Sequence, residues 1–148
     1  MEIALVIESL EKVKKIDDKV LRQLEKQFLA KSDHANAQDI AIIFKILTRP
    51  EYKMSDKSYH KMKELCDFLF KNFDSNCLRR MCHNFAEKYE KGTIKWDIAE
   101  ILIRKFKSLR KKNEIKGSPL FDIKNELFKV KDENVLRRAK QAFHADKN

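Results

Sequence analysis

The chain has 148 residues, of which 43% are hydrophobic, and it contains only two Gly and two Pro. So few turn residues exclude a β-sheet protein of this size, and so much apolar content excludes a disordered chain. The net charge is +10, and no apolar run approaches the roughly 18 residues that span a bilayer. The composition therefore predicts one all-α domain, and its basic surplus points to an acidic partner.

Seven breaks divide the sequence into eight predicted helical segments, the first over 1–15 and the second over about 17–31. Each break carries a residue type that caps or stops a helix. In chain order the breaks are Asp17–Asp18, Asn36, Pro50 with Ser55–Asp56, Asp74–Ser75, Gly92–Thr93, Gly117–Ser118–Pro119 and Asp132–Glu133–Asn134. Asn36 and Asp39 resemble a capping box. The sequence predicts that one helix ends at Gly117. The next helix is expected to have Ser118 as its N-cap and Pro119 as its first helical residue.

Two apolar patterns alternate along these segments. In the odd-numbered segments, apolar residues lie at relative positions 0, 3, 4 and 7. In the even-numbered segments, they lie at relative positions 0, 3 and 7. The odd copies are Ile3/Val6/Ile7/Leu10, Ile40/Ile43/Phe44/Leu47, Leu78/Met81/Cys82/Phe85 and Leu120/Ile123/Lys124/Leu127; the even copies are Leu21/Leu24/Phe28, Met62/Leu65/Leu69, Ala99/Leu102/Phe106 and Leu136/Ala139/Phe143. Most copies lie 37 or 38 residues apart. The pattern predicts a repeated helical hairpin.

Four hairpins are expected, over 1–31, 36–73, 74–112 and 117–146, forming a short right-handed stack with a concave and a convex surface. The last one is either a true repeat or a divergent cap, because Lys124 interrupts its apolar stripe and the spacing is longer there. An irregular helical bundle is the alternative architecture, since any amphipathic helix shows such spacings.

The stretch from Gln38 to Leu47 reads Gln-Asp-Ile-Ala-x-Ile-x-x-x-Leu. With the 37–38-residue period, it resembles the heptatricopeptide and octotricopeptide repeats, and the helical repeats that precede RAP domains in FAST-kinase-like organellar proteins. The resemblance covers about residues 1–112, and no RAP domain is visible. It implies contact with RNA in a mitochondrion or plastid, including a role as an accessory protein on organellar ribosomal RNA.

The basic surplus is confined to one half of the chain. Residues 1–74 hold 14 Lys and Arg against 13 Asp and Glu, whereas residues 75–148 hold 19 against 10. A uniform solubilising coat would be spread evenly, so this asymmetry indicates a partner for the C-terminal half.

The segment 104–112 reads RKFKSLRKK and is the densest group of cations. A helical wheel places Leu102, Phe106 and Leu109 on one side and Arg104, Lys107 and Lys111 on the other, which is how a helix presents cations to phosphates. The candidate nucleic-acid-binding residues are Arg79, Arg80, Arg104, Lys105, Lys107, Arg110, Lys111, Lys112, Arg137 and Arg138. The alternative is a solvated charged face that favours the helix macrodipole.

Other constellations have simpler interpretations. Trp96, Tyr89 and Tyr59 could stack on unpaired bases, but aromatic residues at helical spacing are more often core. Cys77-x4-Cys82-His83 is poorly spaced for zinc, so the cysteines are expected to be reduced and buried. The sequence has no Gly-rich phosphate loop and no catalytic motif that we recognise. We therefore expect neither a cofactor nor a metal, and not an enzyme.

Two functional hypotheses remain. The first is a non-catalytic RNA-binding protein that docks its basic C-terminal half on ribosomal or organellar RNA, as a subunit of a larger complex. The second is a protein scaffold that holds an acidic partner or a helix in its groove. The first hypothesis places the protein in a mitochondrion, although no presequence is visible; otherwise it is expected in the cytoplasm.

Overall fold

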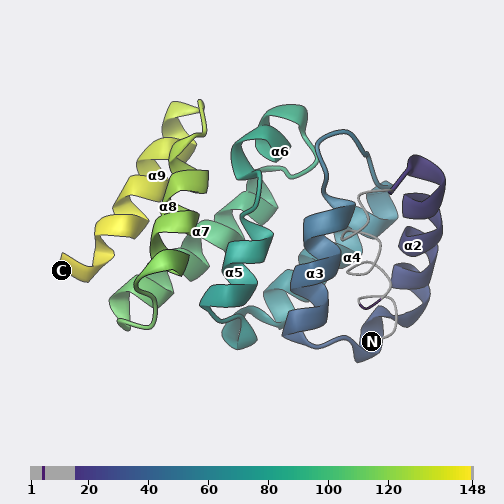
Figure 1. Ribbon diagram of the computed structural model, residues 1–148, viewed down its shortest axis with the longest axis horizontal. Helices are drawn as coiled ribbons and strands as arrows, with labels where there is room; N and C mark the ends of the chain where they lie inside the picture. The colour runs from purple at the N-terminus through teal and green to yellow at the C-terminus, as the bar shows by residue number, and fades with distance from the viewer. Residues whose placement is uncertain (1–4, 6–15, 148) are drawn as a thin grey trace.

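The computed structural model describes residue 5 and residues 16–147, and in this part of the chain every regular element is helical (Figure 1). The α-helices are α2 (Asp18–Lys31), α3 (Ala37–Leu47), α4 (Asp56–Phe68), α5 (Ser75–Met81), α6 (Phe85–Lys91), α7 (Trp96–Lys111), α8 (Ser118–Phe128) and α9 (Glu133–Phe143). Three short 3-10 turns are η1 (Ser32–His34), η2 (Phe70–Asn72) and η3 (His144–Lys147). The all-α prediction is confirmed. The predicted segment 1–15, with its stripe Ile3/Val6/Ile7/Leu10, lies outside the described residues except for Leu5.

At five of the predicted breaks, a polar side chain caps the N-terminus of the helix that follows. Each accepts a hydrogen bond from a backbone N–H in the first turn, which stabilises a helix by about 1 kcal/mol. These N-caps are Asp17, Asn36, Ser55, Asp74 and Asp132. Asn36 and Asp39 form the predicted capping box, with both reciprocal bonds present. The polar residues at the breaks were therefore sufficient to predict where these helices begin.

The segment after Asp74 differs from the prediction, because it forms two helices instead of one. Between α5 and α6, Asn84 adopts a left-handed conformation with φ of 56°, which Asn tolerates better than most residues. The turn is also anchored from outside, since the Asn84 amide N–H donates to Glu126 Oε2 at 2.7 Å. Helix α6 consequently leaves the line of α5.

Two predicted helix starts are also displaced. Helix α7 begins at Trp96, three residues later than predicted, and the Thr93 hydroxyl instead donates to the Thr48 carbonyl at 2.7 Å. Helix α8 begins at Ser118, and Gly117 is its N-cap, with φ of 68°. A positive φ favours Gly, whereas a Ser N-cap has an extended backbone with negative φ. The N-cap therefore falls on Gly117, and Ser118 becomes the first helical residue.

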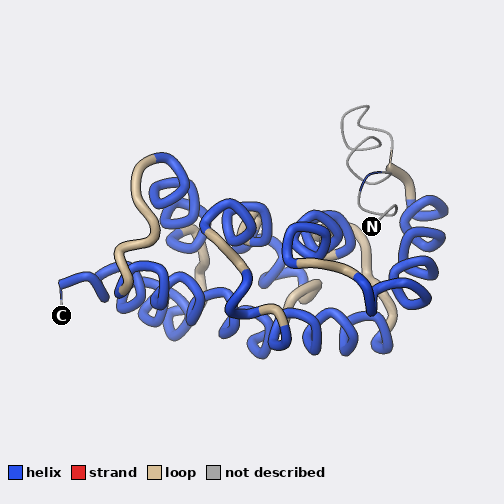
Figure 2. Tube along the Cα trace, turned by 90° about the horizontal axis from the view of Figure 1, so that it is seen from below, coloured by secondary structure: helices blue, strands red, loops and turns tan. Residues whose placement is uncertain are grey.

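The helices pack in two layers (Figure 2). One layer contains α3, α5 and α8, since α5 contacts both α3 and α8. The other contains α4, α7 and α9, since α7 contacts both α4 and α9, and α2 packs on α4 at one end. Helices α8 and α9 contact each other and continue both layers. The arrangement as a right-handed stack of repeated hairpins stays a prediction, as does the alternative of an irregular helical bundle.

The core between the layers contains the predicted apolar stripes. In the described part of the chain, every apolar residue of both patterns is buried except Leu136 and Phe143, which are half-buried. Lys124, which interrupts the last stripe, places its Nζ 5.6 Å and 5.0 Å from the ring centroids of Phe128 and Phe143. This cation–π arrangement explains how a lysine is accommodated at a stripe position.

Candidate nucleic-acid interface

Helix α7 buries one face and exposes a row of cations on the other. The buried face contains Ile98, Ala99, Ile101, Leu102, Ile103, Lys105, Phe106 and Leu109. Arg104, Lys107 and Lys111 are exposed. Their spacing of three and four residues places them on one side of the helix, over a rise of about 10 Å. We call these three residues the α7 cation row.

The cations of this row are available to a ligand to different degrees. The Arg104 guanidinium lies 3.9 Å from Asp67 of α4 and 5.3 Å from the centroid of the Phe70 ring. Lys107 and Lys111 make no ion pair with any described residue. A loose, half-exposed pair such as Arg104–Asp67 contributes little stability, so a phosphate can replace Asp67 at small cost.

Two residues that the sequence placed among the phosphate ligands have internal contacts instead. Lys105 is only 5% exposed and lies over the Phe70 ring, where burial lowers the pKa of its ammonium group. Arg110 donates from Nε to the Phe143 carbonyl and pairs with Asp146, both at 2.8 Å. Both side chains therefore hold neighbouring elements against α7. The sequence could not distinguish them from the exposed Lys107 between them.

Helix α9 adds further cations to the same layer. Arg137 is exposed, on the side of α9 opposite the buried Val135, Ala139 and Ala142. Arg138 places its guanidinium carbon 5.5 Å from the centroid of the Trp96 ring. Lys112, another of the predicted residues, is exposed at the C-terminal end of α7. Lys140, which was not among the predicted residues, is also exposed and lies one turn beyond Arg137. Helices α7 and α9 contact each other, and we call the exposed cations on this helix pair, which are the α7 cation row with Lys112, Arg137 and Lys140, the α7–α9 basic face.

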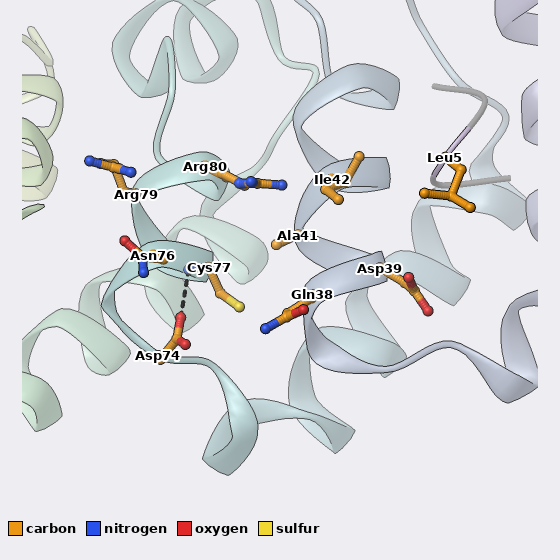
Figure 3. A pocket seen from close by; sticks show the side chains of 10 residues that line it. All are labelled: Leu5, Gln38, Asp39, Ala41, Ile42, Asp74, Asn76, Cys77, Arg79 and Arg80. Carbon is orange, nitrogen blue, oxygen red and sulfur yellow. Dashed lines mark hydrogen bonds between the residues drawn. The ribbon is translucent and has the colours of Figure 1, made fainter. Parts of the chain in front are cut away.

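Arg79 and Arg80 do not belong to this face. They lie on α5, in the other layer, and line a groove of about 460 Å³ between α3 and α5 (Figure 3). Figure 3 shows Arg80 pointing toward Ile42 of α3, whereas Arg79 points away from that helix. Arg79 is 3.6 Å from Asp122 of α8. The structure thus divides the predicted basic residues between two layers and does not bring them together on one surface.

The aromatic residues proposed as stacking platforms are engaged within the fold. The Tyr59 hydroxyl donates to Asp97 at 2.6 Å and accepts from the Lys95 amide N–H at 2.8 Å. Tyr89 stacks on Phe85, and Trp96 lies beneath Arg138. The aromatic ring that is most available is instead Phe68, at the end of α4, which is 82% exposed. Its position off the apolar stripe was the only sequence signal for this exposure.

The three cysteines are free thiols and are buried. Burial raises the pKa of the Cys66 and Cys82 thiols far above their usual range, so neither forms a thiolate readily. Among the described residues, no group of three or more His, Cys, Asp or Glu side chains could hold a metal ion. Nor does this part of the chain contain a helix with the length and apolar character to cross a bilayer.

Comparison with known proteins found no matching family model, no similar curated protein and no similar solved structure. The fold and site by themselves define an all-α protein with two packed layers of helices. One layer carries the α7–α9 basic face and the other carries the groove between α3 and α5.

Proposed function

We propose that this protein is a non-catalytic RNA-binding protein that contacts phosphates through the α7–α9 basic face. The observation that carries the proposal is the α7 cation row, three exposed cations on one side of a helix whose opposite side is core. A packed helix holds such cations in a fixed arrangement, so binding does not require the ordering of a flexible segment.

The expected mode of recognition is contact with the RNA backbone. Lys and Arg that neutralise phosphates release condensed counterions, and this supplies affinity without reading the base sequence. The rings of Tyr59 and Trp96 support this mode, since the cations of Lys95 and Arg138 already lie over one face of each ring. Specificity would then come from the shape of the RNA.

A place in an organelle, and a role as an accessory subunit on ribosomal RNA, belong to the same proposal. They rest on the resemblance of the stretch from Gln38 to Leu47 to heptatricopeptide-type repeats. The charge asymmetry supports an RNA–protein complex as the setting, because the balanced N-terminal half leaves surface for neighbouring proteins.

A salt titration tests this proposal directly. The purified protein is titrated with a structured RNA while the salt concentration is raised from about 50 to 200 mM. Five or six phosphate contacts predict a loss of affinity on the order of 10³-fold over this range. Absence of binding at the lowest salt concentration would contradict the proposal.

The groove between α3 and α5 favours a second candidate function, a scaffold for an acidic peptide. Apolar Ala41 and Ile42 of α3 line one side of the groove, and Arg80 of α5 points toward Ile42 from the other side (Figure 3). The lining also contains the carboxylates of Asp39 and Asp74. An amphipathic segment that places an acidic group beside Arg80 suits this groove. Binding to a protein partner that persists at about 0.5 M salt, where charges are screened within a few Å, would favour this candidate.

A further inference from the structure

Lys88 is a buried amine that the proposed RNA interface does not use. It is only 1% exposed, on α6, the helix that the turn at Asn84 separates from α5. Its Nζ donates to the Lys45 carbonyl at 3.2 Å and lies 5.5 Å from the centroid of the Phe44 ring. The Lys45 carbonyl belongs to the last turn of α3, where carbonyl groups lack partners within the helix.

The charge on Lys88 is poorly compensated. Glu25 provides a contrast, because that buried carboxylate accepts hydrogen bonds from the hydroxyls of Tyr52 and Ser58 and from the Ser55 amide N–H. Burial would raise the pKa of Glu25, but these bonds leave it below its usual value. Lys88 forms no ion pair with any described carboxylate. Its environment therefore disfavours the ammonium form.

The charged groups around Lys88 reinforce this effect. Burial is the largest cause and lowers the pKa of Lys88 to about 7, and the cations Lys45 and Arg49 lower it further. Glu126 opposes the shift, but its carboxylate already accepts from the Asn84 amide N–H and lies 3.7 Å from Lys129. Cys82, the remaining titratable neighbour, is a buried thiol. Near neutral pH a substantial fraction of the amine is therefore unprotonated and nucleophilic.

A small pocket adjoins this amine. Its volume is about 130 Å³, and Lys88, Arg49, His83 and Asn84 are among the residues that line it. Several water molecules would fill this volume, so it can hold a ligand of a few heavy atoms. Arg49 has only a loose pair, 3.8 Å from Glu51, and a guanidinium group binds a carboxylate in bidentate geometry. Glu51 also lines the pocket, so an anionic ligand would take its place beside Arg49. The lining thus combines Lys88 with a guanidinium group whose own carboxylate partner is loosely held.

We propose that Lys88 is a reactive amine that forms an imine with a small aldehyde or ketone carrying a carboxylate, held in this pocket by Arg49. The neutral Nζ attacks the carbonyl carbon and forms the N–C bond. The two amine hydrogens leave with the carbonyl oxygen as one molecule of water, and a C=N bond remains. The step needs no oxidant or reductant, and water reverses it.

Reductive trapping tests this assignment. The protein is incubated with glyoxylate and sodium cyanoborohydride at neutral pH, and the modified lysines are identified by peptide mass spectrometry. We expect Lys88 to be modified at least about tenfold faster than exposed Lys107, because a neutral amine in contact with a bound carbonyl reacts as a near-unimolecular pair. Modification of Lys88 no faster than that of Lys107 would overturn the proposal.

Two controls separate the pocket from burial alone. Lys105 is also buried with a lowered pKa, but it lies over the Phe70 ring, and we expect it to react no faster than Lys107. Arg49→Gln should slow the trapping of glyoxylate at Lys88 several-fold and leave the trapping of neutral acetaldehyde unchanged. Equal reactivity of Lys88 and Lys105, or equal slowing with both aldehydes, would contradict a carboxylate-binding site. The comparison of Lys88 with Lys105 and Lys107 is made within the wild-type protein, so it does not depend on whether a variant folds.

Discussion

Replacing Arg104, Lys107 and Lys111 together by Glu is expected to lower the affinity for RNA about a hundredfold at low salt. Each lost phosphate contact contributes about 1 kcal/mol, and 1.4 kcal/mol corresponds to a factor of ten. The slope of log affinity against log salt should also fall by about three, one for each contact. Fluorescence anisotropy with a labelled RNA at several salt concentrations measures both quantities.

A matched control removes the effect of net charge. Lys26, Lys53 and Lys57 are exposed and lie in the electrically balanced half of the chain, so their replacement by Glu changes the net charge by the same amount. We expect this variant to keep most of the affinity and the salt slope. If both triple variants weaken binding equally, the α7 cation row has no particular role and only total charge matters.

Lys88→Met is expected to stabilise the fold, although it removes a hydrogen bond. In the unfolded chain the pKa of Lys88 has its ordinary value of 10.5, whereas burial lowers it to about 7 in the folded protein. A difference of one in pKa corresponds to about 1.4 kcal/mol. After allowance for the lost bond to the Lys45 carbonyl, we expect a gain of roughly 3 kcal/mol in the free energy of unfolding at pH 6.

The pH dependence of this gain has a definite sign. Between pH 7 and 10.5 the unfolded state keeps the proton on Lys88 and the folded state does not, so stability of the wild type rises with pH in this window. The advantage of Lys88→Met should therefore be greatest below pH 7 and should disappear toward pH 10. Urea denaturation of both proteins at several pH values measures it. An advantage that stays constant with pH would show that Lys88 does not carry this shifted pKa.

The core could be predicted from the sequence because a single physical signal, apolar spacing, determines it. The stripe Ile40/Ile43/Phe44/Leu47 is entirely buried, as are Ala99, Leu102 and Phe106. The caps were predictable for the same reason, since Asn36 and Asp39 bond to backbone groups within one turn. Local patterns of this kind need no knowledge of the tertiary structure.

The candidate site was less predictable because it depends on contacts between elements distant in sequence. Lys105 and Lys107 are two residues apart, yet Phe70 covers one and the other is exposed. The break at Asn84 rests partly on Glu126, which is 42 residues away. From the sequence alone, Lys88 would be predicted to be an ordinary surface lysine. In the structure, the turn at Asn84 places it against the end of α3. No periodicity in the sequence encodes such contacts.

Mapping the RNA contacts by ultraviolet crosslinking and mass spectrometry tests the central claim most directly. The protein is crosslinked to a bound structured RNA, and the peptides that carry nucleotides are identified. If the α7–α9 basic face binds the backbone, the crosslinks should fall within residues 104–112 and 137–140. Crosslinks confined to Arg79, Arg80 and the groove between α3 and α5, with none on α7, would contradict it.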